Sequence, residues 1–111
     1  MLFYPFQIDD SFKWARDMDV VVEVDYFDGD RGSFTVQYDS HDPAATLDGA
    51  YKDCAERIHL GGTRTWKTAR FVLRRARFDG LQNAGADFRI AAAIGSGLQV
   101  RRVTVKRASA P

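Results

Sequence analysis

The stretch from Leu81 to Ala93, LQNAGADFRIAAA, places polar side chains where a turn runs into an apolar segment. Gln82 and Asn83 lie in the turn, and Asp87 and Arg89 follow with apolar residues between them. Amide, carboxylate and guanidinium groups are planar hydrogen-bonding groups that can hold a polar ligand. Asparagine also tolerates left-handed backbone and forms local turns, so a purely structural turn is the alternative for Asn83.

The residues that could serve as catalysts are few. His41 and His59 should lie on different elements, because a strand's length of chain separates them. A dyad of Cys54 and His41 is conceivable, since both fall in one loop region, but no nucleophile elbow, zinc spacing or phosphate loop accompanies it. We therefore expect no enzyme activity in this chain and interpret Cys54 as a small buried residue.

Aspartates recur in DSHDPAATLDGAYKD, residues 39–53. Oxygen-rich loops of this kind can hold calcium. The spacing of an EF-hand is absent, however, and Asp-Pro and Asp-Gly pairs are also standard turn dipeptides. We expect no cofactor, with a structural calcium ion as the alternative.

The composition is that of a soluble globular protein, most simply one domain over residues 1–111, with 45% hydrophobic and 28% charged residues. A net charge of +1 predicts no general attraction to nucleic acid or to an anionic membrane. No apolar run approaches the roughly 18 residues that span a bilayer. The single cysteine excludes an internal disulfide and a thiolate metal cluster.

Apolar and polar residues alternate with a period of two, which predicts half-buried antiparallel strands. The segment LFYPF, residues 2–6, should be an edge strand, because Pro5 cannot donate to a ladder. In the last segment the parity of the apolar residues changes, so we predict a β-bulge near Arg101 and Arg102. A helical turn is expected over residues 9–15. Further strands are expected within residues 20–28, 32–40, 57–60, 66–74, 86–93 and 97–107.

About seven short strands, with an ordered core over residues 2–106, predict an all-β antiparallel sandwich, which we expect to be of jelly-roll type. Alternate connections, at residues 9–19, 41–55 and 75–85, are long and should gather at one end. Loops on a rigid sandwich often carry function, so we expect the principal site at this end. Its candidate residues are Trp14, His41, Asp48, Tyr51, Gln82 and Asn83.

The order of several segments is similar to that of a known group of modules. An aromatic strand is followed by DDSF, VEVDY, GSFTVQYDS, AYKD, WKTARFVL, ARF and QNAGADFRI. Over roughly residues 3–105 this order resembles the non-catalytic modules, galactose-binding-like or carbohydrate-binding, that accompany catalytic domains in bacterial polysaccharide-degrading enzymes. The resemblance implies a carbohydrate-associated β-sandwich in a larger secreted protein, extracellular or periplasmic, without a fixed set of sugar contacts.

The chain departs from these modules in one respect. They usually have a further strand before the aromatic one, whereas this chain starts almost on it. A missing strand would leave a sheet edge open and favour self-association.

A sugar site needs an aromatic ring for the C–H face of the sugar and planar polar groups for its hydroxyls. We expect Trp14 and Tyr51 to stack on the sugar; the alternative for both is a plug at the open end of the sandwich. The hydroxyl-binding candidates are Gln82, Asn83, His41 and Asp48.

An outward sheet face is the second candidate site, with Arg70, Asp87 and Arg89. Cross-strand ion pairing with Glu23 and Asp25 would explain such a face without any ligand.

Two functions from different classes remain open. The first is a carbohydrate-binding module that brings a catalytic domain to a polysaccharide or oligosaccharide. The second is a structural or protein-interaction module that packs against a catalytic domain or another copy and binds no sugar. Exposed aromatic residues at the long-loop end would favour the first. A broad apolar patch, or an unpaired edge along residues 2–6, would favour the second.

Overall fold

The computed structural model describes residues 2–8, 18–40, 49–77, 82, 87–93 and 98–107. Within these ranges the secondary structure is entirely β. The strands are β1 (Leu2–Phe6), β2 (Met18–Phe27), β3 (Ser33–Tyr38), β4 (Lys52–Asp53), β5 (Ile58–His59), β6 (Trp66–Ala76), β7 (Phe88–Ala92) and β8 (Val100–Arg107).

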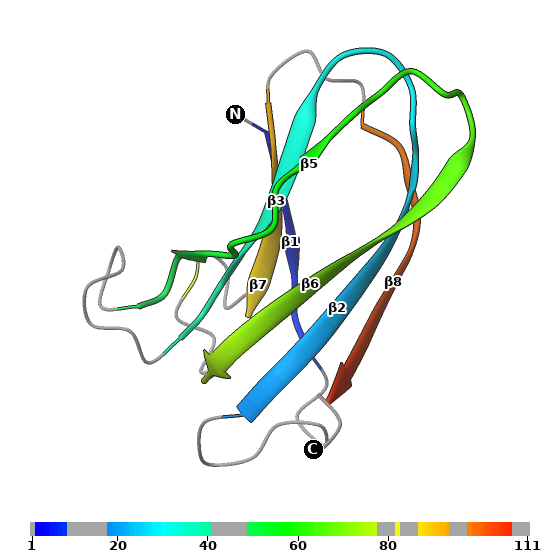
Figure 1. Cartoon of the computed structure of the whole chain (residues 1–111). Helices are drawn as coiled ribbons and strands as arrows, with labels where there is room; N and C mark the ends of the chain where they lie inside the picture. The colour runs from blue at the N-terminus through cyan, green and yellow to red at the C-terminus, as the bar shows by residue number, and fades with distance from the viewer. Residues whose placement is uncertain are drawn as a thin grey trace.

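The strands form two antiparallel sheets that face each other (Figure 1). Sheet A has the order β1-β7-β3-β4, with β5 also paired to β3, and sheet B has the order β6-β2-β8. This confirms the predicted all-β antiparallel architecture. It also confirms β1 as an edge strand, because in the described structure β1 pairs only with β7.

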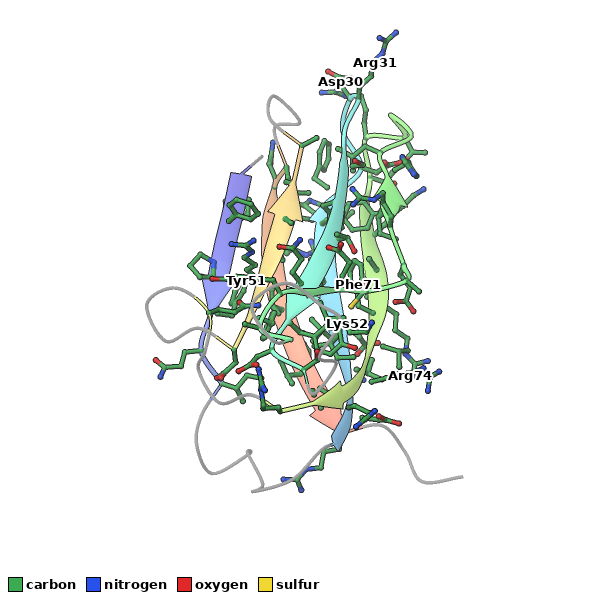
Figure 2. All side chains as sticks on the ribbon, turned by 90° about the vertical axis from the view of Figure 1, so that its left-hand side faces the viewer. Asp30, Arg31, Tyr51, Lys52, Phe71 and Arg74 are labelled. Atoms are coloured by element: carbon green, nitrogen blue, oxygen red, sulfur yellow. The ribbon has the colours of Figure 1, made fainter. Side chains whose placement is uncertain are left out.

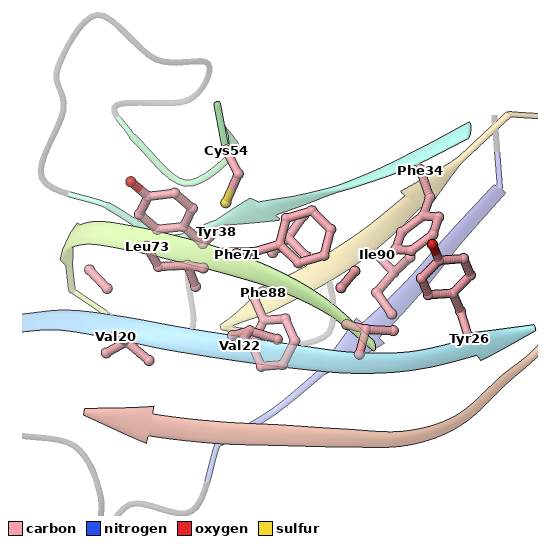
Figure 3. Close-up of a cluster of buried hydrophobic side chains, with 14 of the residues drawn as sticks. Val20, Val22, Tyr26, Phe34, Tyr38, Cys54, Phe71, Leu73, Phe88 and Ile90 are labelled. Atoms are coloured by element: carbon pink, nitrogen blue, oxygen red, sulfur yellow. The ribbon is translucent and has the colours of Figure 1, made fainter. Parts of the chain in front are cut away.

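The core lies between the two sheets, where alternate residues of each strand point inward (Figure 3). In β2, Val22 and Val24 are fully buried, while Glu23 between them is only half-buried. Phe34 of sheet A packs on Phe71 of sheet B, with 5.8 Å between the ring centres. Burying one such side chain contributes about 1.5–3 kcal/mol, so the alternation itself selects which face of each strand turns inward.

The predicted β-bulge in the last strand is confirmed. Asp25 of β2 pairs with Arg102 and Tyr26 pairs with Val100, so Arg101 is the extra residue. The bulge restores the parity, because Val103 then lies opposite the buried Val24.

The described residues that flank the three long connections meet at one end of the sandwich, as predicted. The amide of Asp87 donates to the carbonyl of Phe6 at 2.9 Å, and the amide of Asp39 donates to the carbonyl of Asp87 at 2.9 Å. Arg77 joins them through an ion pair from its Nε to Oδ1 of Asp39 at 2.8 Å. The helical turn predicted over residues 9–15 lies outside the described residues.

Asp28 holds the opposite end together. Its carboxylate accepts hydrogen bonds from the amide of Gly61 at 2.6 Å and from Oγ1 of Thr63 at 2.6 Å, and Lys67 Nζ lies 3.3 Å away. The Thr63 hydroxyl, followed by the Gly61 amide, holds the pKa of Asp28 well below its ordinary value. This end of the sandwich is therefore fixed by a carboxylate that stays ionised.

Candidate functional site

The outer face of sheet A carries a group of side chains that three neighbouring strands bring together. Gln37 of β3 pairs with Arg89 of β7. Phe3 of β1 pairs with Ala91, two residues after Arg89 in β7. Successive side chains of a strand alternate between faces, so Phe3, Gln37 and Arg89 share the face turned away from the core. Tyr51 and Asp53 reach this face from the segment around β4. We call these five residues the Arg89 cluster (Figure 2, which views the molecule from this side and labels Tyr51).

The guanidinium of Arg89 lies between two aromatic rings. Its Cζ is 3.7 Å from the ring centre of Phe3 and 4.1 Å from that of Tyr51. Each such contact between a cation and a ring contributes about 0.5–2 kcal/mol. The two rings restrict the position of the planar guanidinium and leave its edges as the directions of approach.

Hydrogen bonds fix the cluster along one edge of the guanidinium. Nε of Arg89 donates to Oε1 of Gln37 at 2.7 Å, and Nε2 of Gln37 donates to Oδ1 of Asp53 at 2.8 Å. The terminal nitrogens of Arg89 have no hydrogen-bond or ion-pair partner in the described part of the chain. The cluster thus presents unused donors in a fixed plane.

The cluster is partly open to solvent. Phe3 is 44% exposed and Asp53 is exposed, Gln37 and Arg89 are half-buried, and Tyr51 is only 9% exposed. Burial lowers the pKa of Arg89, and the nearby Tyr51 and Asp53 oppose this shift. The guanidinium remains charged at neutral pH, because arginine does not lose its proton under such conditions.

A second feature is a groove of about 980 Å³ between the edge strands β1 and β8, which we call the edge groove. Two exposed aromatic residues line it, Tyr4 and Trp66, each 39% exposed. Arg101 lies over the Trp66 ring, with Cζ 4.6 Å from the ring centre. The remaining lining is mainly apolar and includes Phe6, Ile90, Leu98, Val103 and Val105.

On the opposite side of the sandwich, residues 49–60 connect the two sheets. There the amide of Cys54 donates to the carbonyl of Val36 at 2.9 Å, and Cys54 Sγ lies 3.9 Å from the carbonyl of Val72. Tyr38 OH donates to the carbonyl of Arg74 at 2.8 Å. Among the described residues, these contacts join the two sheets along the side of β3 and β6.

Two of the predicted site residues, Tyr51 and Arg89, come together in the Arg89 cluster. Gln82 is only 4% exposed, and its Nε2 donates to the carbonyls of Gln37 at 3.1 Å and Ala50 at 2.7 Å. Gln82 therefore joins two backbone segments through its Nε2. Four candidates lie outside the described residues: Trp14, His41, Asp48 and Asn83.

The expected sheet-face trio does not form one surface. Asp87 is fully buried, and its Oδ2 accepts a hydrogen bond from the amide of Ile8 at 2.9 Å, so its carboxylate does not lie on an open surface. Arg70 is exposed on sheet B, opposite Glu23, whereas Arg89 lies on sheet A. On sheet B, ion pairing does occur across strands, between Lys106 and Glu23 at 2.6 Å.

Three cluster residues were missed from the sequence: Phe3, Gln37 and Asp53. Gln37 is a polar residue between the apolar Val36 and Tyr38, and this alternation indicates the outward face. Phe3 lies two residues from Pro5, so these two side chains should share a face of the edge strand. Nothing local indicated that β1 and β3 are the neighbours of β7, or that β4 pairs with β3.

The reactive groups have structural settings. Cys54 is buried as predicted, and its burial raises the pKa of the thiol above the ordinary value, which disfavours the reactive thiolate. Its proposed partner His41 lies outside the described residues. Among the residues placed in the structure, no three histidine, cysteine or acidic side chains come together as a possible metal site. No helix in the described ranges is long and apolar enough to cross a membrane.

Comparison of the chain with family models, with curated proteins and with solved structures found no match.

Proposed function

We propose that the chain is a non-catalytic carbohydrate-binding module. The observation that carries this proposal is the Arg89 cluster, in which an exposed ring and planar polar groups share one rigid sheet face. In this proposal the sandwich is of the galactose-binding-like jelly-roll type. It belongs to a larger, secreted bacterial enzyme, extracellular or periplasmic, and brings the catalytic domain to its polysaccharide.

The cluster has the two kinds of group that a sugar needs. The exposed part of the Phe3 ring can cover a C–H face, while the terminal nitrogens of Arg89 and the carboxylate of Asp53 can bond hydroxyls. The side chains are already fixed by ring contacts and by the Asp53–Gln37–Arg89 hydrogen bonds. Binding would therefore order few rotamers, and less conformational entropy would be lost than with mobile side chains.

Phe3 and Tyr4 offer a matched pair of variants to locate the site. They are neighbours in β1 with similar exposure, 44% and 39%, but Phe3 contacts Arg89 on the outer face and Tyr4 lines the edge groove. We expect Phe3→Ala to weaken polysaccharide binding about fivefold or more, because one stacking ring contributes on the order of 1 kcal/mol or more. Tyr4→Ala should bind like the wild type. Affinity electrophoresis in gels that contain soluble plant and algal polysaccharides measures both.

The opposite ranking, with Tyr4→Ala impaired and Phe3→Ala unchanged, would move the site to the edge groove. No retardation of the wild-type protein by any polymer, with albumin as the reference, would contradict sugar binding itself.

The edge groove favours the second candidate function, a protein-interaction module. The described residues leave one edge of β1 unpaired, and β1 carries no charged residue that would discourage pairing with another chain. We propose a second copy as the partner, with the two β1 edges paired antiparallel about a two-fold axis. Tyr4 and Phe6, which line the groove, would be covered in such a dimer.

A charge at the edge tests this second candidate. We expect the wild-type protein to be dimeric at micromolar concentration and Tyr4→Lys to be monomeric, because an edge lysine would have to be desolvated on pairing. Light scattering coupled to size-exclusion chromatography measures the mass, and Arg70→Gln, at an exposed position of sheet B away from the β1 edge, serves as the control. A monomeric wild type would remove the dimer from consideration.

A further inference from the structure

We infer that the Arg89 cluster selects sugars that carry a carboxylate, so that its ligand is an acidic polysaccharide built from uronic acids. This inference rests on the proposed carbohydrate-binding function and specifies its ligand class.

The contacts of Arg89 leave its terminal nitrogens available to a ligand. One edge of the guanidinium is used, because Nε donates to Gln37, and both faces are covered by the rings of Phe3 and Tyr51. The terminal nitrogens have no partner among the residues that the structure places. What remains is a planar pair of donors that a ligand approaches in the plane of the guanidinium.

The terminal donors of Arg89 match the two oxygens of a carboxylate. A carboxylate accepts two parallel N–H donors of a guanidinium, and such charge-assisted hydrogen bonds are about twice as strong as neutral ones. A hydroxyl oxygen also accepts hydrogen bonds, but it brings no charge, so its bonds to a guanidinium are the weaker ones. The unused donors of Arg89 therefore favour an acidic sugar over a neutral one of the same shape.

The charge of Arg89 is not neutralised by a directly paired acid among the described residues. Asp53 is the acid that acts on Arg89 electrostatically, but its Oδ1 is bonded to Gln37, and no ion pair joins an acid to Arg89 within the described ranges. Arg89 thus differs from Arg77, whose Nε is paired with the buried Asp39 at 2.8 Å. The cation on the sheet face is held in place but not neutralised by direct contact.

The ring of Phe3 specifies a sugar as the source of the carboxylate. Phe3 packs on the guanidinium and still leaves 44% of its surface exposed beside it. A uronic acid has a C–H face next to its carboxylate, so one residue of the polymer can cover the ring and reach the donors together.

The experiment compares each acidic polymer with its own carboxyl-reduced form. Polygalacturonate, alginate and hyaluronan, each before and after reduction of the carboxylates to primary alcohols, are titrated into the wild-type protein by calorimetry at 150 mM salt. We expect at least one acidic polymer to bind about tenfold or more tighter than its reduced form, the ratio that follows from losing one charge-assisted pair.

Two arginine variants accompany the polymers. Arg89→Gln should lose the preference for the acidic form, and Arg89→Lys should retain part of it, because lysine keeps the charge without the planar fork. Arg70→Gln is the control, since it removes the same charge from the exposed face of sheet B. A thermal melt of each variant shows whether it is folded. If a variant does not fold, the comparison of acidic and reduced polymers with the wild-type protein still tests the inference.

The remaining outcomes are distinct. Equal binding of an acidic polymer and its reduced form would overturn the inference and leave the sugar-binding function standing. Equal losses from Arg70→Gln and Arg89→Gln would overturn it in favour of unspecific charge attraction. Binding to neutral polysaccharides alone would also overturn it, and no binding to any polymer would contradict the proposed function as well.

Discussion

Arg89 illustrates how neighbours determine the role of a single residue. Arg70 and Arg89 both sit at polar positions of alternating strands, and the sequence placed them in one candidate surface. In the structure Arg70 lies exposed on sheet B, while Arg89 is held between two rings on sheet A. The difference comes from residues far away in the chain, Phe3 and Tyr51, which no local pattern connects to Arg89.

Gln82, a predicted ligand-binding residue, makes structural contacts that the sequence did not indicate. Its amide bonds the carbonyls of Gln37 and Ala50 from a buried position. We expect Gln82→Ala to lower the free energy of unfolding by about 1–3 kcal/mol, because two buried acceptors lose their donor.

Urea unfolding measures this change, with Gln99→Ala as the control, since Gln99 is exposed. A loss below about 0.5 kcal/mol, the usual range for surface substitutions, would show that the Gln82 bonds do not hold this end of the sandwich.

At the scale of elements, the regular alternation of the longer strands made them predictable. The inward and outward residues differ in polarity, so β2, β3, β6 and β7 were identified, and the shift in parity located the bulge at Arg101. The two-residue strand β4 was missed, because two residues show no alternation. The order β1-β7-β3 was not predictable, since pairing between distant strands depends on the whole sandwich, and the Arg89 cluster exists only because of that order.

The turn after β2 carries a prediction about pH. The pKa of Asp28 is held low in the folded protein, so its contribution to stability is complete above the unfolded value of about 3.8 and is lost as the pH falls toward the folded pKa. We expect Asp28→Asn to lower the melting temperature near neutral pH. As the pH falls below about 4, the variant should lose less stability than the wild type, because it has no carboxylate to protonate at this position.

Melting curves across this pH range measure both effects. Asp30→Asn is the matched control, because Asp30 lies in the same turn with 90% of its side chain exposed, and its ion pair among the described residues is with the exposed Arg64 at 3.5 Å. Parallel curves for the wild type and Asp28→Asn would contradict the role of the Asp28 carboxylate.

At the scale of the whole molecule, two regions of the surface differ in chemistry. The outer face of sheet A holds charged and planar groups around Arg89, whereas the side between β1 and β8 is an apolar groove. A module of a larger enzyme would need both kinds of surface, one for a polysaccharide and one for a neighbouring domain or copy. In the proposed function, the Arg89 cluster would bind the polysaccharide.

The most direct test of sugar binding at the Arg89 cluster is an NMR titration of the wild-type protein with oligosaccharides from a polymer that retards it in affinity electrophoresis. The account predicts that the side-chain Nε–H signal of Arg89 and the ring signals of Phe3 and Tyr51 shift in a saturable way, while the ring signals of Tyr4 and Trp66 stay in place. Saturable shifts confined to Tyr4 and Trp66, or none at all, would contradict it.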